Sequence, residues 1–121
     1  MKDEETLEIS KKIRQICTRT IRELSNVLPQ EVSSILAKYT FIGGPFVRSE
    51  LYEENNEKII IIVLPNEKDF FNLLKEAKDK DLSGLTVPYD KVLKFDFYNS
   101  SKNLYTVMVY CRSYLPTLTI E

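Results

Sequence analysis

The chain has 121 residues, of which 43% are hydrophobic and 29% are charged, and its formal net charge is −1. This length predicts one domain that is large enough to bury a core without disulfides or a metal. The composition excludes a disordered chain, and the absence of histidine excludes every Ser–His and Cys–His nucleophile system.

The N-terminus and the apolar runs predict the location of the protein. The first residues, MKDEETLE, are acidic and lack the apolar segment of a secretory signal. The longest apolar run, 59–64, is far shorter than the ~20 residues that a membrane span needs. We therefore expect a cytoplasmic protein with no membrane partner. Glutamine is rare while Lys, Glu and Ile are abundant, which is a bias typical of proteins from hyperthermophiles.

The N-terminal third is predicted to be helical. Over 4–28 a series of mostly apolar residues recurs at spacings of three and four and so shares one helix face: Ile9, Ile13, Ile16, Thr20, Leu24 and Val27. Pro29 interrupts this helix. A second, shorter helix follows, with apolar residues in the i, i+3, i+4, i+7 pattern from Val32 to Tyr39, and it is expected to end at or before Gly43.

The stretch FIGGPF at 41–46 contains two of the three glycines. A phosphate-binding loop follows a strand and opens a helix. Here a helix is predicted before Gly43 and Gly44 and a strand after them, which favours a helix cap followed by a turn that Pro45 fixes.

A hairpin is predicted next, with a first strand at 46–53, a turn at 53–57 and a second strand at 58–64. The second strand contains four consecutive Ile, which favour extended backbone. Because its apolar run is unbroken, we expect it to be a central strand that is buried on both faces.

A third helix is predicted over 67–80, with Asn66 as its N-cap and Gly84 as the residue that ends it. Its inner face is expected to hold Phe70, Leu73, Leu74 and Ala77. The last third is predicted to be a second hairpin, because apolar and polar residues alternate over 91–98 and over 104–112.

The element order is therefore ααββαββ, with a short edge strand at 117–121 as an optional addition. This order predicts the α+β class: a mostly antiparallel sheet of four to five strands with three helices packed on it. Residues 1–121 are expected to form a single domain, with a helical N-terminal part (1–42) and a ββαββ sheet part (43–121).

No cluster of residues indicates catalysis, a cofactor or a metal. Many metal-dependent nucleases carry Glu-x-Lys on a strand, but the one match, Glu76 to Lys78, falls on a predicted helix, where the two side chains do not converge. The acidic turn at 50–57 lacks the central glycine of a calcium loop. Cys17 and Cys111 are expected to be small buried hydrophobes, and the sequence leaves open whether they form a disulfide. We assign no catalytic, cofactor-binding or metal-binding residues.

Charge is unevenly distributed along the chain. The net charge is −3 over 1–8, +5 over 9–48, −4 over 49–85 and +1 over the remainder. The basic excess is concentrated in the first predicted helix, at Lys11, Lys12, Arg14, Arg19 and Arg22. Such a stripe can contact the phosphates of a nucleic acid. Alternatively, these residues form a solvated helix face, and acidic residues elsewhere in the fold balance its positive charge.

The second surface feature is the tyrosine-rich hairpin and the apolar segment after it. Tyr side chains interleaved with Lys and Arg can stack bases, but Tyr is equally favoured at protein interfaces. The apolar C-terminal segment can pair with the sheet edge of a partner. The candidate interface residues are Tyr98, Tyr105, Tyr110, Tyr114, Leu115, Leu118 and Ile120.

These features predict a small non-enzymatic protein-interaction module, an accessory subunit or regulator of a larger intracellular complex. Its partner is expected to be another protein or a second copy of itself. The alternative is a nucleic-acid-associated accessory factor of replication or transcription that uses the basic helix. A carboxylate- or metal-dependent hydrolase is the least favoured of the three.

Overall fold

The computed structural model describes residues 2–43, 45–52, 58–89 and 92–112. The helices in these residues are α1 (Lys2–Val27), α2 (Gln30–Leu36), α3 (Pro45–Leu51) and α4 (Glu67–Asp79). The strands are β1 (Phe41–Gly43), β2 (Ile59–Leu64), β3 (Thr86–Tyr89), β4 (Val92–Tyr98) and β5 (Leu104–Cys111). The predicted α+β class is confirmed.

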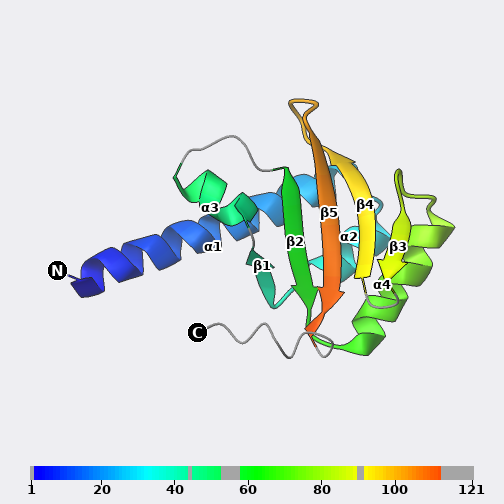
Figure 1. Ribbon diagram of the computed structural model, residues 1–121, viewed down its shortest axis with the longest axis horizontal. Coiled ribbons are helices and arrows are strands. Elements are labelled where there is room, and N and C mark those ends of the chain that lie inside the picture. Colours follow the sequence, from blue (N-terminus) through cyan, green and yellow to red (C-terminus); the bar gives the residue numbers. More distant parts are fainter. Residues whose placement is uncertain (1, 44, 53–57, 90–91, 113–121) are drawn as a thin grey trace.

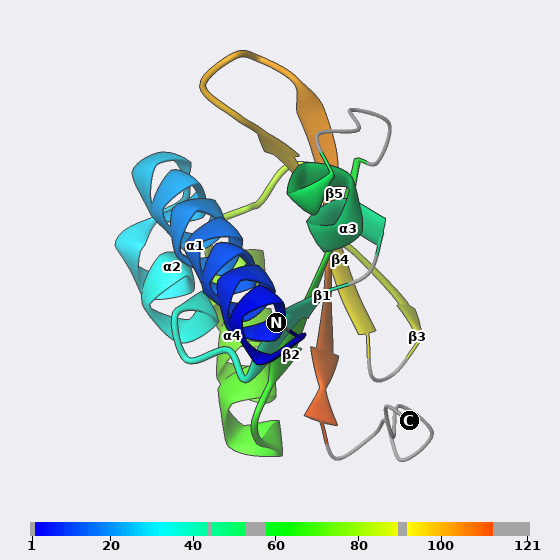
Figure 2. The ribbon, with the colours of Figure 1, turned by 90° about the vertical axis from the view of Figure 1, so that its left-hand side faces the viewer.

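The five strands form one mixed sheet in the order β1-β2-β5-β4-β3. β2 runs parallel to β5, and the other neighbouring pairs are antiparallel. Figure 2 shows α1, α2 and α4 on one side of this sheet. α3 packs against α1 and the β1–β2 end of the sheet. Among the residues described, no helix covers the opposite side of the sheet. Figure 1 views this side from the front, and we call it the outer sheet face.

The core lies between the sheet and the helices. Side chains alternate along a strand, so one set from each central strand points to the helices: Ile60, Ile62, Leu64, Leu93, Phe95, Phe97, Val107, Val109 and Cys111, all buried. The register pairs Ile60 with Val107 and Ile62 with Val109. β2 lies between two neighbours, as predicted, but it is not buried on both faces along its whole length, because Ile59 is 40% exposed.

The predicted strand at 46–53 is wrong, since Pro45–Leu51 is the helix α3. Proline suits the first position of a helix, because its φ is already helical and its missing N–H has no partner there. As a helix the segment buries Phe46 and Val47 in the core. The antiparallel partner of β2 is instead the three-residue strand β1, which ends at Gly43.

The ends of α4 are partly as predicted. The N–H of Asp69 donates to Oδ1 of Asn66 over 2.9 Å, so Asn66 is the N-cap. The helix ends at Asp79 with Lys80 as its C-cap, and the residue that terminates it is Asp81 rather than Gly84. Asp81 has a φ of 53°, and the N–H of Leu82 donates to the carbonyl of Ala77, five residues back. This is a Schellman motif with aspartate in the left-handed position.

The predicted β4–β5 hairpin is confirmed, and its turn is held by Asn99. Oδ1 of Asn99 accepts from the N–H groups of Ser101 and Asn103. β3 was not predicted, and its short sequence TVPY contains Pro88, which suits an edge strand because proline donates no ladder hydrogen bond. The predicted turn at 53–57 and the predicted strand at 117–121 lie outside the described residues.

Candidate functional site

One face of α1 forms a shallow basic depression on the surface. Six residues line it, and they are Lys11, Arg14, Gln15, Thr18, Arg19 and Arg22. All six side chains are exposed, and we call this set the basic face. Four of the six are Lys or Arg, and none is acidic. Lys12 is also exposed but does not line the depression. The structure thus brings together four of the five basic residues that the sequence singled out.

The opposite side of α1 holds the basic face in place. Ile16, Cys17, Thr20 and Leu24 are buried against the rest of the fold. The hydroxyl of Thr20 donates to the carbonyl of Ile16 over 2.7 Å, so its polar atom is satisfied within the core. Because this side is fixed, residues three and four positions apart on the other side point outwards as one stripe.

α1 also extends beyond the core at its ends. Of the apolar residues that the periodicity predicts to share its buried face, Ile9 is 44% exposed and Val27 is 53% exposed. In Figure 1 the N-terminal half of α1 projects past the edge of the sheet, and the side chains at 5–12 are all exposed. Helical periodicity identifies a face, but it does not say how much of the helix the core covers.

An acid from another element lies beside the basic face. Nη2 of Arg19 is 3.2 Å from Oε1 of Glu50 in α3. Among the described residues, Arg19 is the one member of the basic face that has an ion-pair partner. The sequence did not indicate this contact, because residues 46–53 were predicted to be a strand. In the part of the chain that the structure describes, Lys11, Arg14 and Arg22 have no ion-pair partner.

The candidate interface residues lie on both faces of the sheet. Tyr98 and Tyr110 belong to the outer sheet face, and Tyr98 is 52% exposed. Tyr105 belongs to the helix-facing side, where its ring lies 5.8 Å from Phe46 and 4.9 Å from Nζ of Lys58. The other four candidates, Tyr114, Leu115, Leu118 and Ile120, lie outside the described residues.

The outer sheet face also carries apolar residues that the sequence analysis did not single out. Ile59 is 40% exposed and Leu104 is 45% exposed. Leu104 is the cross-strand partner of Tyr98, and the half-buried pair of Ile61 and Met108 lies farther along the same face. Strand alternation alone could not reveal this patch, since it depends on the parallel pairing of β2 with β5.

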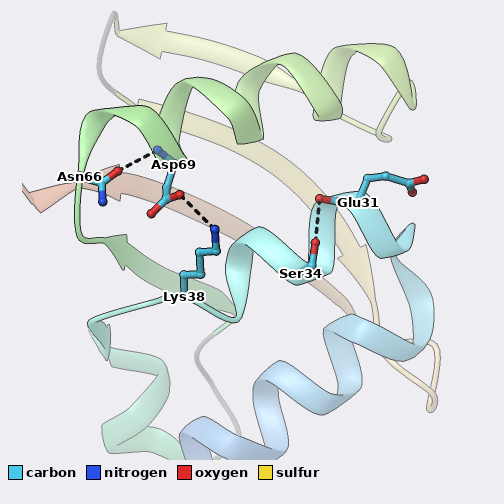
Figure 3. A network of polar contacts seen from close by, with 5 residues as sticks. All are labelled: Glu31, Ser34, Lys38, Asn66 and Asp69. Carbon is cyan, nitrogen blue, oxygen red and sulfur yellow. Dashed lines mark hydrogen bonds and ion pairs between the residues drawn. The ribbon is translucent and has the colours of Figure 1, made fainter.

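A polar network joins α2 to α4, and Figure 3 shows part of it. Nζ of Lys38, just after α2, lies 3.4 Å from Oδ1 of Asp69 near the start of α4. At the opposite ends of the two helices, Nζ of Lys80, just after α4, lies 3.5 Å from Oε2 of Glu31, near the start of α2. Each acid is near a helix N-terminus and each lysine near a C-terminus, so all four charges suit their helix dipoles.

The contacts of this network link the two helices. The hydroxyl of Ser34 donates to the backbone carbonyl of Glu31, so it is not held beside a base. A backbone hydrogen bond and the charge of Lys80 hold the pKa of Glu31 below its ordinary value. The Glu31 side chain is exposed at the surface, and its ion pair with Lys80 connects α2 to the end of α4.

The remaining candidates for chemistry do not form a site. Cys17 and Cys111 are both buried, and burial raises the pKa of the Cys17 thiol, which disfavours the reactive thiolate. Glu76 and Lys78 lie two positions apart on α4, where side chains do not face each other. Among the described residues, no group of three or more His, Cys, Asp or Glu is arranged to hold a metal ion.

The order of elements around FIGGPF is the reverse of the predicted order, because β1 ends at Gly43 and α3 begins at Pro45. A strand followed by a helix is the order of a phosphate-binding loop. However, α3 has only seven residues, and the sequence lacks the Gly-Lys-Ser/Thr that reaches the phosphates. The stretch has the order of such a loop but not its functional residues.

None of the described helices combines the length and the apolarity that crossing a bilayer requires. Comparison of the chain with protein-family models, curated proteins and solved structures found no match. The function must therefore be inferred from the surface of this chain itself.

Proposed function

We propose that the protein is a non-enzymatic binding module that contacts the phosphate backbone of a nucleic acid through the basic face, as an accessory factor in a larger assembly. One observation carries this proposal: a single depression gathers Lys11, Arg14, Arg19 and Arg22 without an acid in its lining. The sequence alone favoured a protein partner. We reverse that order because four of the basic residues lie together, whereas the three candidate interface residues that the structure describes, Tyr98, Tyr105 and Tyr110, are divided between two faces of the sheet.

The chemistry of the basic face suits phosphate. Guanidinium groups donate in a planar fork that matches phosphate oxygens, and ammonium groups act as point charges. The two neutral members, Gln15 and Thr18, can donate further hydrogen bonds between the cations. The affinity of such a surface comes mainly from counterion release, so it falls as the salt concentration rises.

The test is retention on immobilised double-stranded and single-stranded DNA at low salt. We expect the wild type to be retained and the double variant Arg14→Glu with Arg22→Glu to pass through. The matched control is Lys75→Glu with Lys78→Glu, which makes the same change in net charge at two exposed positions of α4. Absence of retention of the wild type, or equal loss in both double variants, would overturn the proposal.

A protein partner on the outer sheet face is the second candidate function. The supporting observation is the apolar patch of Ile59, Leu104 and Tyr98, which are 40%, 45% and 52% exposed. Apolar and aromatic side chains on one exposed face are typical of protein interfaces. A second copy of the chain or another protein with an apolar surface would bury this patch.

Light scattering and pull-down from the native extract test this second candidate. We expect either a dimer or a co-purifying partner. We expect Leu104→Asp to abolish this association. The matched control is Phe71→Asp on α4, since Phe71 is 49% exposed but lies on a helix rather than on the outer sheet face. A strict monomer with no partner that depends on Leu104 would rule this candidate out.

A further inference from the structure

We infer that residues 113–121 of the chain pack back over one end of the outer sheet face and close that end to partners. This inference goes beyond the proposed function and does not depend on the binding of a nucleic acid. It follows from two side chains that are buried on this face, from the change in exposure along the face, and from the sequence of the segment that continues from the sheet there.

Two buried valines lie outside the main core. Val63 in β2 is 3% exposed and Val92 in β4 is 7% exposed. Both point to the outer sheet face, because the residues next to them, Ile62 and Leu93, belong to the core between the sheet and the helices. Among the buried hydrophobic residues that the structure describes, these two are the ones that do not join that core. The helices therefore do not explain their burial.

The two valines and Tyr110 form one row across the sheet. Tyr110 in β5 is the cross-strand partner of Val63 on one side and of Val92 on the other. Side chains stand roughly perpendicular to a sheet, so neighbours in a row cover one another's flanks and leave the tips open. Exposures of 3% and 7% leave no open tips. A further layer over this row accounts for the burial.

Exposure increases along the outer sheet face away from this row. The next row, which includes Met108, is half-buried. Towards the far end, Ile59, Leu104 and Tyr98 are 40%, 45% and 52% exposed. Successive rows are two residues apart along a strand, or about 7 Å. The further layer therefore extends over one or two rows, and the rest of the face is open (Figure 1).

The segment 113–121 starts at the covered end of the face. β5 ends at Cys111, one residue after Tyr110, and the described residues end at Arg112. A segment of this length spans up to about 30 Å when it is extended. One or two rows of the sheet measure much less than this, so the segment is long enough to turn back and cover them.

The sequence of this segment suits an apolar surface on one side and water on the other. Leu118 and Ile120 alternate with Thr117 and Thr119, so in extended backbone the two aliphatic side chains share one side. With that side against the valines, the threonines face solvent. Leu118 and Ile120 are thus assigned to a contact within the chain and not to the sheet edge of a partner. A partner on the outer sheet face is then confined to its open end.

Thiol reactivity in the full chain tests the inference. In Val63→Cys, we expect the new thiol to react slowly with an aromatic disulfide reagent. Leu118→Asp with Ile120→Asp should raise this rate at least about tenfold, because the segment can no longer bury its aliphatic side. The matched control is Thr117→Asp with Thr119→Asp, which makes the same charge change on the other side of the segment and should alter the rate by less than about twofold.

Two further measurements guard against a loss of folding. The native thiols of Cys17 and Cys111 are buried, so they should stay slow to react in every variant that is folded. Leu118→Ala with Ile120→Ala removes the aliphatic contact without adding charge, and it should also accelerate the reaction of the thiol at position 63. The rate should not depend on the protein concentration, because the segment and the sheet belong to one chain.

Three results would overturn the inference. The first is a thiol in Val63→Cys that reacts as fast as the thiol of Asn72→Cys, an exposed position on α4. The second is an equal effect of the aliphatic and the threonine pairs of substitutions. The third is a rate that falls as the protein concentration rises, which would identify a second copy of the chain as the cover. None of these results bears on the basic face, so the proposed function is tested separately.

Discussion

Nη2 of Arg19 in α1 lies 3.2 Å from Oε1 of Glu50 in α3, which places a carboxylate beside the basic face. The side chains of the pair are 53% and 30% exposed, so water screens the attraction. Exposed ion pairs of this kind contribute ~0.2–1 kcal/mol. The contact matters more for binding than for stability, since it occupies a cation that would otherwise face a ligand.

The first prediction concerns this acid. Glu50→Gln removes the carboxylate and frees Arg19, so we expect the affinity for DNA to rise by about 1.4-fold to fivefold, in line with the ~0.2–1 kcal/mol of an exposed pair. Anisotropy at a fixed low salt concentration measures the change. The control is Glu76→Gln, which makes the same charge change on α4. An equal rise in both variants would mean that net charge, and not Arg19, is responsible.

The second prediction concerns the N-cap of α4. Asn66→Ala removes the oxygen that accepts from the N–H of Asp69, and we expect it to lower the free energy of unfolding by about 1 kcal/mol. Asn66→Ser keeps an acceptor and should cost much less. Chemical denaturation measures both, with Asn72→Ala in the exposed middle of α4 as the control. Equal stability of the Ala and Ser variants would show that capping is unimportant here.

The third prediction concerns the turn before β3. Gly84 has a φ of 68°, and a Cβ at this position would lie 2.3 Å from Oδ2 of Asp96. Gly84→Ala therefore combines an unfavourable backbone conformation with a steric clash, and we expect it to destabilise the fold by about 1–3 kcal/mol.

The double variant Gly84→Ala with Asp96→Ala separates these two causes. Removing the carboxylate relieves the clash but not the backbone cost, so the two substitutions should be non-additive in a double-mutant cycle. Thermal or urea unfolding of the four proteins supplies the cycle. Simple additivity would contradict the close approach of Gly84 and Asp96.

The fourth prediction concerns pH. A backbone hydrogen bond and then Lys80 hold the pKa of Glu31 below its ordinary value of 4.5 in the folded protein. The unfolded chain therefore takes up the proton first as the pH falls, so the stability from Glu31 is complete above pH 4.5 and is lost towards the lower folded pKa. Urea unfolding of the wild type and Glu31→Gln measures this loss. Their stabilities should differ at neutral pH and converge in acid, and a constant difference would disprove the assignment.

The sequence by itself determined the elements whose signals are local. Alternation over 91–98 and 104–112 predicts the β4–β5 hairpin, which the structure places at 92–98 and 104–111, because successive side chains of a strand point to opposite faces. The side chain of Asn66 contacts a backbone group only three residues away, so its cap is also readable from the sequence. The basic stripe of α1 is a third case, since spacings of three and four define a helix face before any partner is known.

The tertiary structure decided the features that depend on contacts distant in sequence. The short segment at 45–51 has no decisive local preference, and it becomes α3 because a helix buries Phe46 and Val47. Four consecutive Ile predict a strand, but not that its neighbour is the parallel strand β5, because that pairing requires a crossover through α4. Arg19 and Glu50 meet only because α3 packs on α1, so the charge that a ligand meets at the basic face is a property of the fold.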